Sequence, residues 1–264
     1  MRMYFRELKS GIKSLLIWTV VIALLIVVAV VKFSAFESSP ESLAILDSMP
    51  PQLMEALSMR AFNLTTLEGF FGAMFVFFAL MGAMAAALWG SEAIAKEERD
   101  RTVEFTLVLP VPRRQIVTAK LLAALTNCAL FVLFAWLISV AASRNYDPGK
   151  SLFDFLRLEM LAMFMIELVF LSLGVLLACA SKTPRRVGSM AVGLILGLYF
   201  ISIFAGMHEK LSWLKYLTPF GWFNASEFFS SGRFELYALA LTGLAVVLFL
   251  FAAYFAYDRR DLYF

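Results

Sequence analysis

The stretch from Phe70 to Trp89 reads FFGAMFVFFALMGAMAAALW and contains no charged residue. A helix needs about 20 apolar residues to cross a hydrocarbon core of roughly 30 Å, so this stretch is long enough to span a membrane. Backbone polar groups must be bonded internally in lipid, and a continuous apolar run satisfies them as a helix rather than as alternating strands. The stretch therefore predicts a transmembrane helix.

Further apolar runs of similar length occur on both sides of this stretch, at residues 15–33, 121–142, 158–180, 187–206 and 236–257. The chain of 264 residues is 61% hydrophobic and 16% charged. Soluble chains are closer to half apolar and a quarter charged. We therefore expect an all-α polytopic membrane protein, in which residues 1–264 form a single transmembrane domain with six spans.

Residues 1–13 precede the first span and are basic, with Arg2, Arg6, Lys9 and Lys13. A signal peptide also begins with basic residues, but the run that follows is too long for one and no small-residue cleavage site comes after it. We expect an uncleaved first span preceded by a short amphipathic helix in the membrane interface.

Basic residues are distributed unevenly between the two sides of the membrane. If the N-terminus is cytoplasmic, roughly two thirds of the 23 Lys and Arg residues lie on the cytoplasmic side, as the positive-inside rule requires. We therefore expect both termini in the cytoplasm.

Several function classes are excluded by single features of the chain. A net charge of +3 is too small to indicate nucleic-acid binding. Cys128 and Cys179 lie in apolar runs, where they are expected to be small buried hydrophobes, and His208 has no second histidine with which to bind a metal. Residues 149–151 resemble the end of a phosphate-binding loop, but Arg144 stands where that motif needs glycine. We predict no catalytic residue, no metal site and no nucleotide site in this chain.

The segment of residues 207–233, before the last span, is rich in aromatic side chains. Pro219 and Gly221 interrupt it, which indicates two short helices that re-enter the membrane from outside. The alternative is an aromatic belt at the headgroup level. The residues that we assign to the re-entrant segment are Tyr216, Pro219, Phe220 and Trp222.

The loop of residues 90–119 is more specific than an ordinary positive-inside loop, which is the alternative interpretation. From Glu97 to Arg114 it reads EERDRTVEFTLVLPVPRR. Acidic and basic side chains at helical spacing support a solvated helix, and no partner for them within the chain is evident from the sequence. Pro110 and Pro112 then end the helix and force an extended corner before the next span. We expect a cytoplasmic coupling helix that docks a soluble partner.

This loop resembles the coupling region of the permease subunits of ABC-2 type (type V exporter) ABC transporters. The positions that agree with the family pattern are Glu98, Arg99, Thr102, Glu104, Leu107, Pro110, Val111, Arg113 and Lys120. The sequence departs from the pattern at Arg101, Thr106 and Pro112, where the family has glycine, leucine and serine. Residues 216–220, YLTPF, are similar to the Tyr-Leu-Ser-Pro-Phe segment that these permeases carry before the last span.

The resemblance implies an exporter permease in a prokaryotic plasma membrane. Two separate ATPase subunits per complex would bind ATP and Mg, and this chain would bind no cofactor. A second permease chain, identical or paralogous, would complete the transporter. Contact with the ATPase is assigned to Glu97, Glu98, Arg99, Arg101, Thr102, Glu104, Leu107, Pro110, Pro112, Arg113 and Arg114. The substrate would be hydrophobic or amphipathic, and the sequence does not distinguish a drug from a peptide or a lipid.

Two other function classes remain as alternatives. A secondary transporter would show an internal repeat or broken helices with polar intramembrane residues, and no convincing repeat is present. A membrane enzyme would need Ser, His and Asp or metal ligands gathered at one depth, and the spans contain no such cluster.

Glu167 is, in this interpretation of the sequence, the only deep charge. It lies about nine residues into its run, roughly 13 Å along a helix and close to mid-bilayer. A charge there costs about 2.5–3.5 kcal/mol on insertion scales, so a position facing lipid is unfavourable. Two roles stay open, a carboxylate on the substrate pathway and a packing residue at a helix interface. Gly193 and Gly197 form a GxxxG pair, which predicts close helix packing.

Overall fold

The computed structural model describes residues 2–37, 62–100, 112–146, 149–207 and 209–259. Helices are the only regular secondary structure in these residues. Six of the helices are long and apolar enough to cross a membrane, which confirms the predicted all-α polytopic class.

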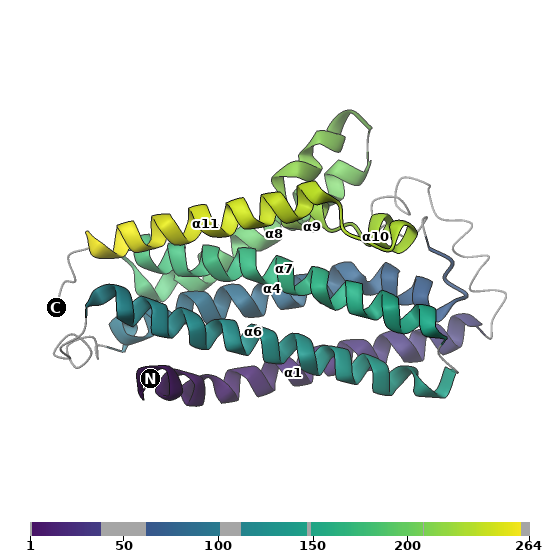
Figure 1. Cartoon of the computed structure of the whole chain (residues 1–264), viewed down its shortest axis with the longest axis horizontal. Coiled ribbons are helices and arrows are strands. Elements are labelled where there is room, and N and C mark those ends of the chain that lie inside the picture. The colour runs from purple at the N-terminus through teal and green to yellow at the C-terminus, as the bar shows by residue number, and fades with distance from the viewer. Residues whose placement is uncertain (1, 38–61, 101–111, 147–148, 208, 260–264) are drawn as a thin grey trace.

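The six long helices lie side by side as an elongated bundle (Figure 1). Each predicted apolar run lies within one of them. Residues 1–13 were predicted as a separate interfacial helix, but from Arg2 onward they continue into the first span without a break. The helices are α1 (Arg2–Glu37), α4 (Leu67–Arg99), α6 (Arg113–Ser143), α7 (Lys150–Ala180), α8 (Val187–Met207) and α11 (Leu236–Asp258).

The bundle has two ends with different contents. We call the end where α1 begins and where α4 and α11 finish the terminal end (Figure 1). The chain after α8 forms the short helices η4 (Glu209–Leu217), α9 (Pro219–Trp222) and α10 (Ala225–Ser231). Of these, α10 lies near the opposite end, called the far end, and α9 lies closer to the middle of the bundle (Figure 1). Two further single turns, η2 (Arg144–Tyr146) and η3 (Pro184–Arg186), flank α7.

Local sequence signals explain where the helices begin. The Thr66 side chain accepts a hydrogen bond from the Gly69 amide at 3.2 Å and caps the start of α4. Pro112 occupies the N-cap position of α6 in an extended conformation, so the predicted proline corner immediately precedes that helix. Pro219 is the first residue of α9, where the lack of an amide proton has no cost.

α4 and α7 form the centre of the bundle. In the apolar part of each, 61% of the residues are buried, whereas in α8 only 11% are. Glycine brings their backbones into contact. A Cβ on Gly90 would collide with the carbonyl oxygen of Leu171, and one on Gly174 would collide with that of Ala87. Small residues permit such close approach between membrane helices.

The outer helices present apolar side chains outward, as a lipid environment requires. Leu24 on α1 is 61% exposed and Phe251 on α11 is 71% exposed. On α8, added Cβ atoms at Gly193 and Gly197 would meet nothing within 4 Å. The predicted close packing of this GxxxG pair is therefore not made by the described residues of this chain.

Candidate functional site

Some of the predicted ATPase-coupling residues lie in residues 101–111, which are outside the described residues, and the rest lie on the two sides of that range. Arg101, Thr102, Glu104, Leu107 and Pro110 lie outside the described residues. The others either end α4 or border the start of α6: Glu97, Glu98, Arg99, Pro112, Arg113 and Arg114. The structure thus describes the two helix ends that border the predicted coupling segment, by which we mean the residues between Arg99 and Pro112.

A buried lysine joins these two helix ends. The ammonium of Lys120, on α6, lies 3.0 Å from Glu97 Oε2 and donates a hydrogen bond to the Ala93 carbonyl at 2.7 Å. The Lys120 side chain is only 2% exposed. The second oxygen of Glu97 pairs with Arg6 of α1 at 3.3 Å. One carboxylate at the end of α4 therefore contacts both α1 and α6.

Further polar contacts attach α1 to the end of α4. Lys96 donates a hydrogen bond to the Ser10 hydroxyl at 2.6 Å, and the Trp89 indole donates one to the Ser14 hydroxyl at 3.0 Å. These contacts lie one and two turns from the Arg6–Glu97 pair along α1. The start of α1 is therefore bound to α4 along several helical turns.

On its other side, the start of α6 is attached to the end of α11. Arg114 forms an ion pair with Asp258 at 2.8 Å, and the Thr118 hydroxyl lies 2.8 Å from that of Tyr254. A buried apolar cluster lies beneath these contacts and includes Val117 and Ala253. α1, α4, α6 and α11 are thereby connected at the terminal end.

This geometry corrects one expectation from the sequence. The charged end of α4 does have partners within the chain, because Glu97 pairs with Lys120 and Arg6. Arg114 is likewise paired, with Asp258. The sequence could not show these contacts, since the partners lie between 23 and 144 positions away along the chain.

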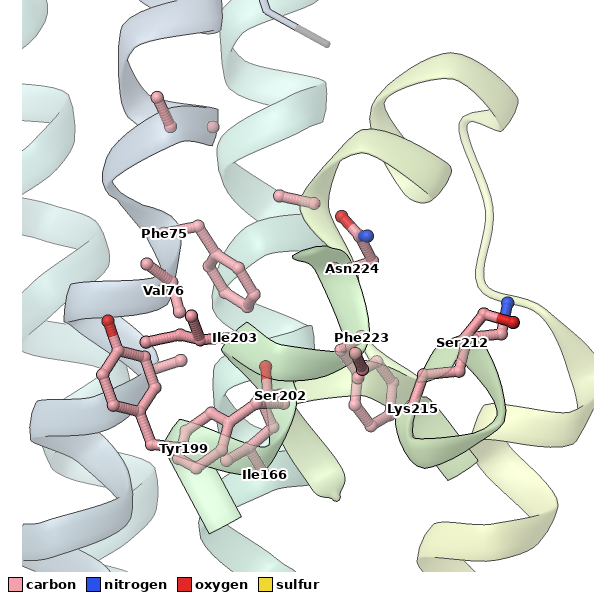
Figure 2. A pocket seen from close by; sticks show the side chains of 18 residues that line it. Phe75, Val76, Ile166, Tyr199, Ser202, Ile203, Ser212, Lys215, Phe223 and Asn224 are labelled. Atoms are coloured by element: carbon pink, nitrogen blue, oxygen red, sulfur yellow. The ribbon is translucent and has the colours of Figure 1, made fainter. Parts of the chain in front are cut away.

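A cavity of about 130 Å³ lies between α4, α7, α8 and the short helices that follow α8, from the middle of the bundle toward the far end. Figure 2 shows apolar side chains on its walls, among them Phe75, Ile203 and Phe223. Ser202 and Asn224 add polar atoms to the same lining. Rings and aliphatic carbons with a few polar groups are typical of small-molecule sites.

The predicted re-entrant residues form one side of this cavity or support it. Phe220 lines the cavity and packs 5.4 Å from the ring of Phe170. The buried Trp222 indole donates a hydrogen bond to the Tyr216 carbonyl at 2.8 Å, which closes the turn around the buried Pro219. The structure therefore brings Tyr216, Pro219, Phe220 and Trp222 together, and their re-entry into the membrane stays a prediction.

Lys215 is the charged residue of the cavity lining. Its ammonium lies 3.5 Å from Glu227, and 5.3 Å and 5.9 Å from the ring centres of Tyr216 and Tyr237. A carboxylate and two ring faces both stabilise an ammonium. The lysine is thereby held at the edge of the cavity with its charge compensated.

Comparison with known protein families covers nearly the whole chain. A family model described as ABC-2 family transporter protein matches residues 1–262. The chain belongs to this ABC-2 family. It is a multi-pass membrane component of an ABC-type transporter, a class of permease that associates with ABC ATPase subunits. A search of curated proteins finds no match to this sequence.

In this ABC-2 protein, two carboxyl groups are fully buried on α7. Glu159 and Glu167 are each 0% exposed. The carboxyl oxygens of Glu159 have no hydrogen-bond partner among the described residues, and the Cys128 thiol lies within reach of the Glu167 carboxyl. Glu159 is thus a second buried carboxyl in α7, which was not singled out from the sequence. Glu159 was missed because it stands at the border of the apolar run, whereas α7 begins at Lys150, well before that border.

Glu167 lies at a helix interface rather than in the lining of the cavity. A Cβ on Gly82 of α4 would stand 2.7 Å from Glu167 Oε1, so this glycine makes room for the carboxyl. The thiol of Cys128, on α6, lies beside the same carboxyl. The cavity is lined by the neighbouring Ile166 instead. A pathway role for Glu167 stays a prediction.

Proposed function

We propose that this ABC-2 protein is the membrane-spanning permease subunit of an ATP-driven exporter in a prokaryotic plasma membrane, with both termini in the cytoplasm. ATP and Mg are bound by two separate ATPase subunits, and a second permease chain completes the complex. One observation carries the proposal: the coupling segment leaves from two helix ends that are joined through Lys120 and Glu97. A force applied to that segment reaches four helices directly.

The ATPase contact is proposed to lie between Glu98 and Arg113. Glu97 and Arg114 form ion pairs within the chain, so they support the ends of the segment. Arg99 and Asp100 pair with each other at 3.3 Å but remain 40% and 46% exposed, so they present charge to a partner at the end of α4. Charges at such a contact set the register and the rate of association.

A hydrophobic or amphipathic substrate is proposed from the cavity between α4, α7 and α8. Its lining combines the rings of Phe75, Phe220 and Phe223 with polar atoms of Ser202 and Asn224. An apolar body would contact the rings, and a polar group would reach the hydroxyl and amide. A substrate that is charged along its whole length fits this lining poorly.

Charge reversal in the coupling segment tests the proposed function. Glu98→Lys combined with Glu104→Lys should weaken co-purification of the ATPase subunit at least tenfold, since losing one partner of a charged pair costs about 2–5 kcal/mol. Loss of ATPase stimulation should accompany it, while the membrane chain remains folded.

The matched control reverses two exposed acidic residues away from that segment, Asp154→Lys and Glu235→Lys, at the starts of α7 and α11. The control should retain the ATPase subunit. Equal retention by both double variants would reject the coupling assignment and leave the basic loop as a topology signal.

A further inference from the structure

Lys120 is an unusual residue for the beginning of a membrane helix because its charged side chain is almost completely buried. It is 2% exposed, whereas Arg6, which pairs with the same carboxylate, is 56% exposed. A buried charge is tolerated only when it is paired and hydrogen-bonded. Lys120 meets this condition through Glu97 and the Ala93 carbonyl.

We propose that Lys120 is a positioning residue for the ATPase-contacting segment. Lys120 and Glu97, here called the anchor pair, fix the end of α4 against the start of α6, the two helix ends that border the ATPase-contacting segment. This inference rests on the proposed function, because it assigns a role to the borders of the same segment. Lys120 itself does not contact the ATPase.

The position of the anchor pair along both helices supports this role. Glu97 lies in the last turn of α4, and Lys120 lies two turns into α6. The Ala93 carbonyl is one turn before Glu97, so the ammonium bonds two successive turns of α4. Two bonds to one helix restrict both the distance and the rotation between α4 and α6.

The burial of Lys120 distinguishes the anchor pair from an ion pair on the protein surface. Exposed pairs contribute little, because water solvates both charges when they separate. Separation of Lys120 from Glu97 would leave the ammonium with the Ala93 carbonyl, in a site where Trp89 and Ala123 alternate with polar and charged residues that include Glu7, Glu92 and Asn127. The end of α4 is therefore held close to α6 whenever Lys120 stays buried.

The test measures the distance between the two helix ends in the full chain. Spin labels are attached to cysteines at Asp100 and Gln115, both exposed, in a background with Cys128→Ala and Cys179→Ala. Labelled chain is diluted with unlabelled chain in lipid nanodiscs, so that only distances within one chain are recorded. Lys120→Met removes the charge and keeps an apolar stem of similar length, and Lys120→Arg keeps the charge.

A narrow distance distribution is expected for the unsubstituted chain and for Lys120→Arg, and a broad one for Lys120→Met. Affinity for the ATPase subunit should fall about tenfold in Lys120→Met and return in Lys120→Arg, because the two helix ends lose one fixed arrangement. If the buried lysine had no positioning role, Lys120→Arg would not restore both the narrow distance distribution and the affinity for the ATPase subunit.

A narrow distribution in Lys120→Met would overturn the positioning role. If Lys120→Met does not fold, Glu97→Gln is measured instead, because Lys120 then retains its hydrogen bond to the Ala93 carbonyl. A narrow distance distribution in Glu97→Gln would also overturn the positioning role. A broad distribution with unchanged ATPase affinity would show that the anchor pair does not serve the ATPase contact. If the unsubstituted chain binds no ATPase, the proposed function fails, and the spin-label comparison still decides whether Lys120 fixes the helix ends.

Discussion

The two ends of the bundle differ in the contacts that predominate, although the Lys215–Glu227 ion pair lies outside the terminal end and an apolar cluster lies within it. At the terminal end, ion pairs and hydrogen bonds join α1, α4, α6 and α11, with Lys120 buried among them. At the far end, rings pack on rings: Phe228 lies 5.5 Å from Phe75 and 5.7 Å from both Phe155 and Phe234.

This difference has a physical consequence for transport. Ion pairs and hydrogen bonds are directional and fail when their geometry changes, so the terminal end transmits displacement as a unit. Ring contacts are spread over many atoms and can be remade in a neighbouring arrangement. The far end is therefore suited to change shape around a substrate, and the terminal end is suited to convey motion.

The largest effect on stability is expected from Glu97→Ala at the terminal end. This substitution removes the ion-pair partner of the buried Lys120 ammonium and leaves Glu7 and Glu92 as the carboxylates of the same site. Breaking a buried pair costs up to about 3–5 kcal/mol. Thermal unfolding of the purified protein in detergent measures the loss. Arg6→Ala is the control, because that side chain is 56% exposed and its loss should cost no more than about 1 kcal/mol. Equal losses in the two variants would show that the burial of Lys120 is unimportant.

A smaller effect is expected from Phe228→Leu at the far end. Leucine keeps an apolar side chain in this site, which is 2% exposed, but removes the ring contacts with Phe75, Phe155 and Phe234. We expect a loss of about 1–3 kcal/mol, since each aromatic pair contributes roughly 0.5–1.5 kcal/mol beyond burial. The loss should not depend on salt concentration. A strong salt dependence would contradict the proposed contrast between the two ends.

Arg114→Gln should have a still smaller effect. The Arg114 side chain is 74% exposed, so its pair with Asp258 contributes about 0–1 kcal/mol in spite of the 2.8 Å separation. Salt titration of the unfolding temperature should show that this small contribution vanishes at high ionic strength. A loss as large as that of Glu97→Ala would mean that the attachment of α6 to α11 is the stronger one.

The smallest effect on folding is expected from Glu167→Gln, in the middle of the bundle. Glutamine has the same shape, so the packing against Gly82 is retained. Yield and unfolding temperature should therefore stay close to those of the unsubstituted protein. Altered transport or altered ATPase stimulation in this well-folded variant would assign Glu167 to the pathway, and unchanged activity would assign it to packing.

The long helices were predictable from sequence because lipid imposes a simple requirement on length and composition. The stretch from Phe70 to Trp89 satisfies that requirement without any knowledge of its neighbours. A helix start at Pro219 could likewise be anticipated, because proline limits the backbone locally. The coupling segment was recognised from residues that are adjacent in sequence.

The pairing between helices was not predictable in the same way. Lys120 was noticed as a position that agrees with the family pattern, but its partner depends on how α6 rotates against α4. Glu159 was missed, since the border of an apolar run does not mark the border of a helix. The GxxxG pair of Gly193 and Gly197 suggested packing, but sequence alone does not say whether the partner belongs to the same chain.

The most direct test of the account is photo-crosslinking from the border of the coupling segment. A photoreactive amino acid replaces Asp100, exposed at the end of α4, or Asn63, exposed before the start of α4 at the far end. Illumination of the intact complex is followed by mass spectrometry of the crosslinked chains. We predict that the ATPase subunit is captured from position 100 and not from position 63. Capture from position 63, or from neither position in a complex that still hydrolyses ATP, would contradict the account.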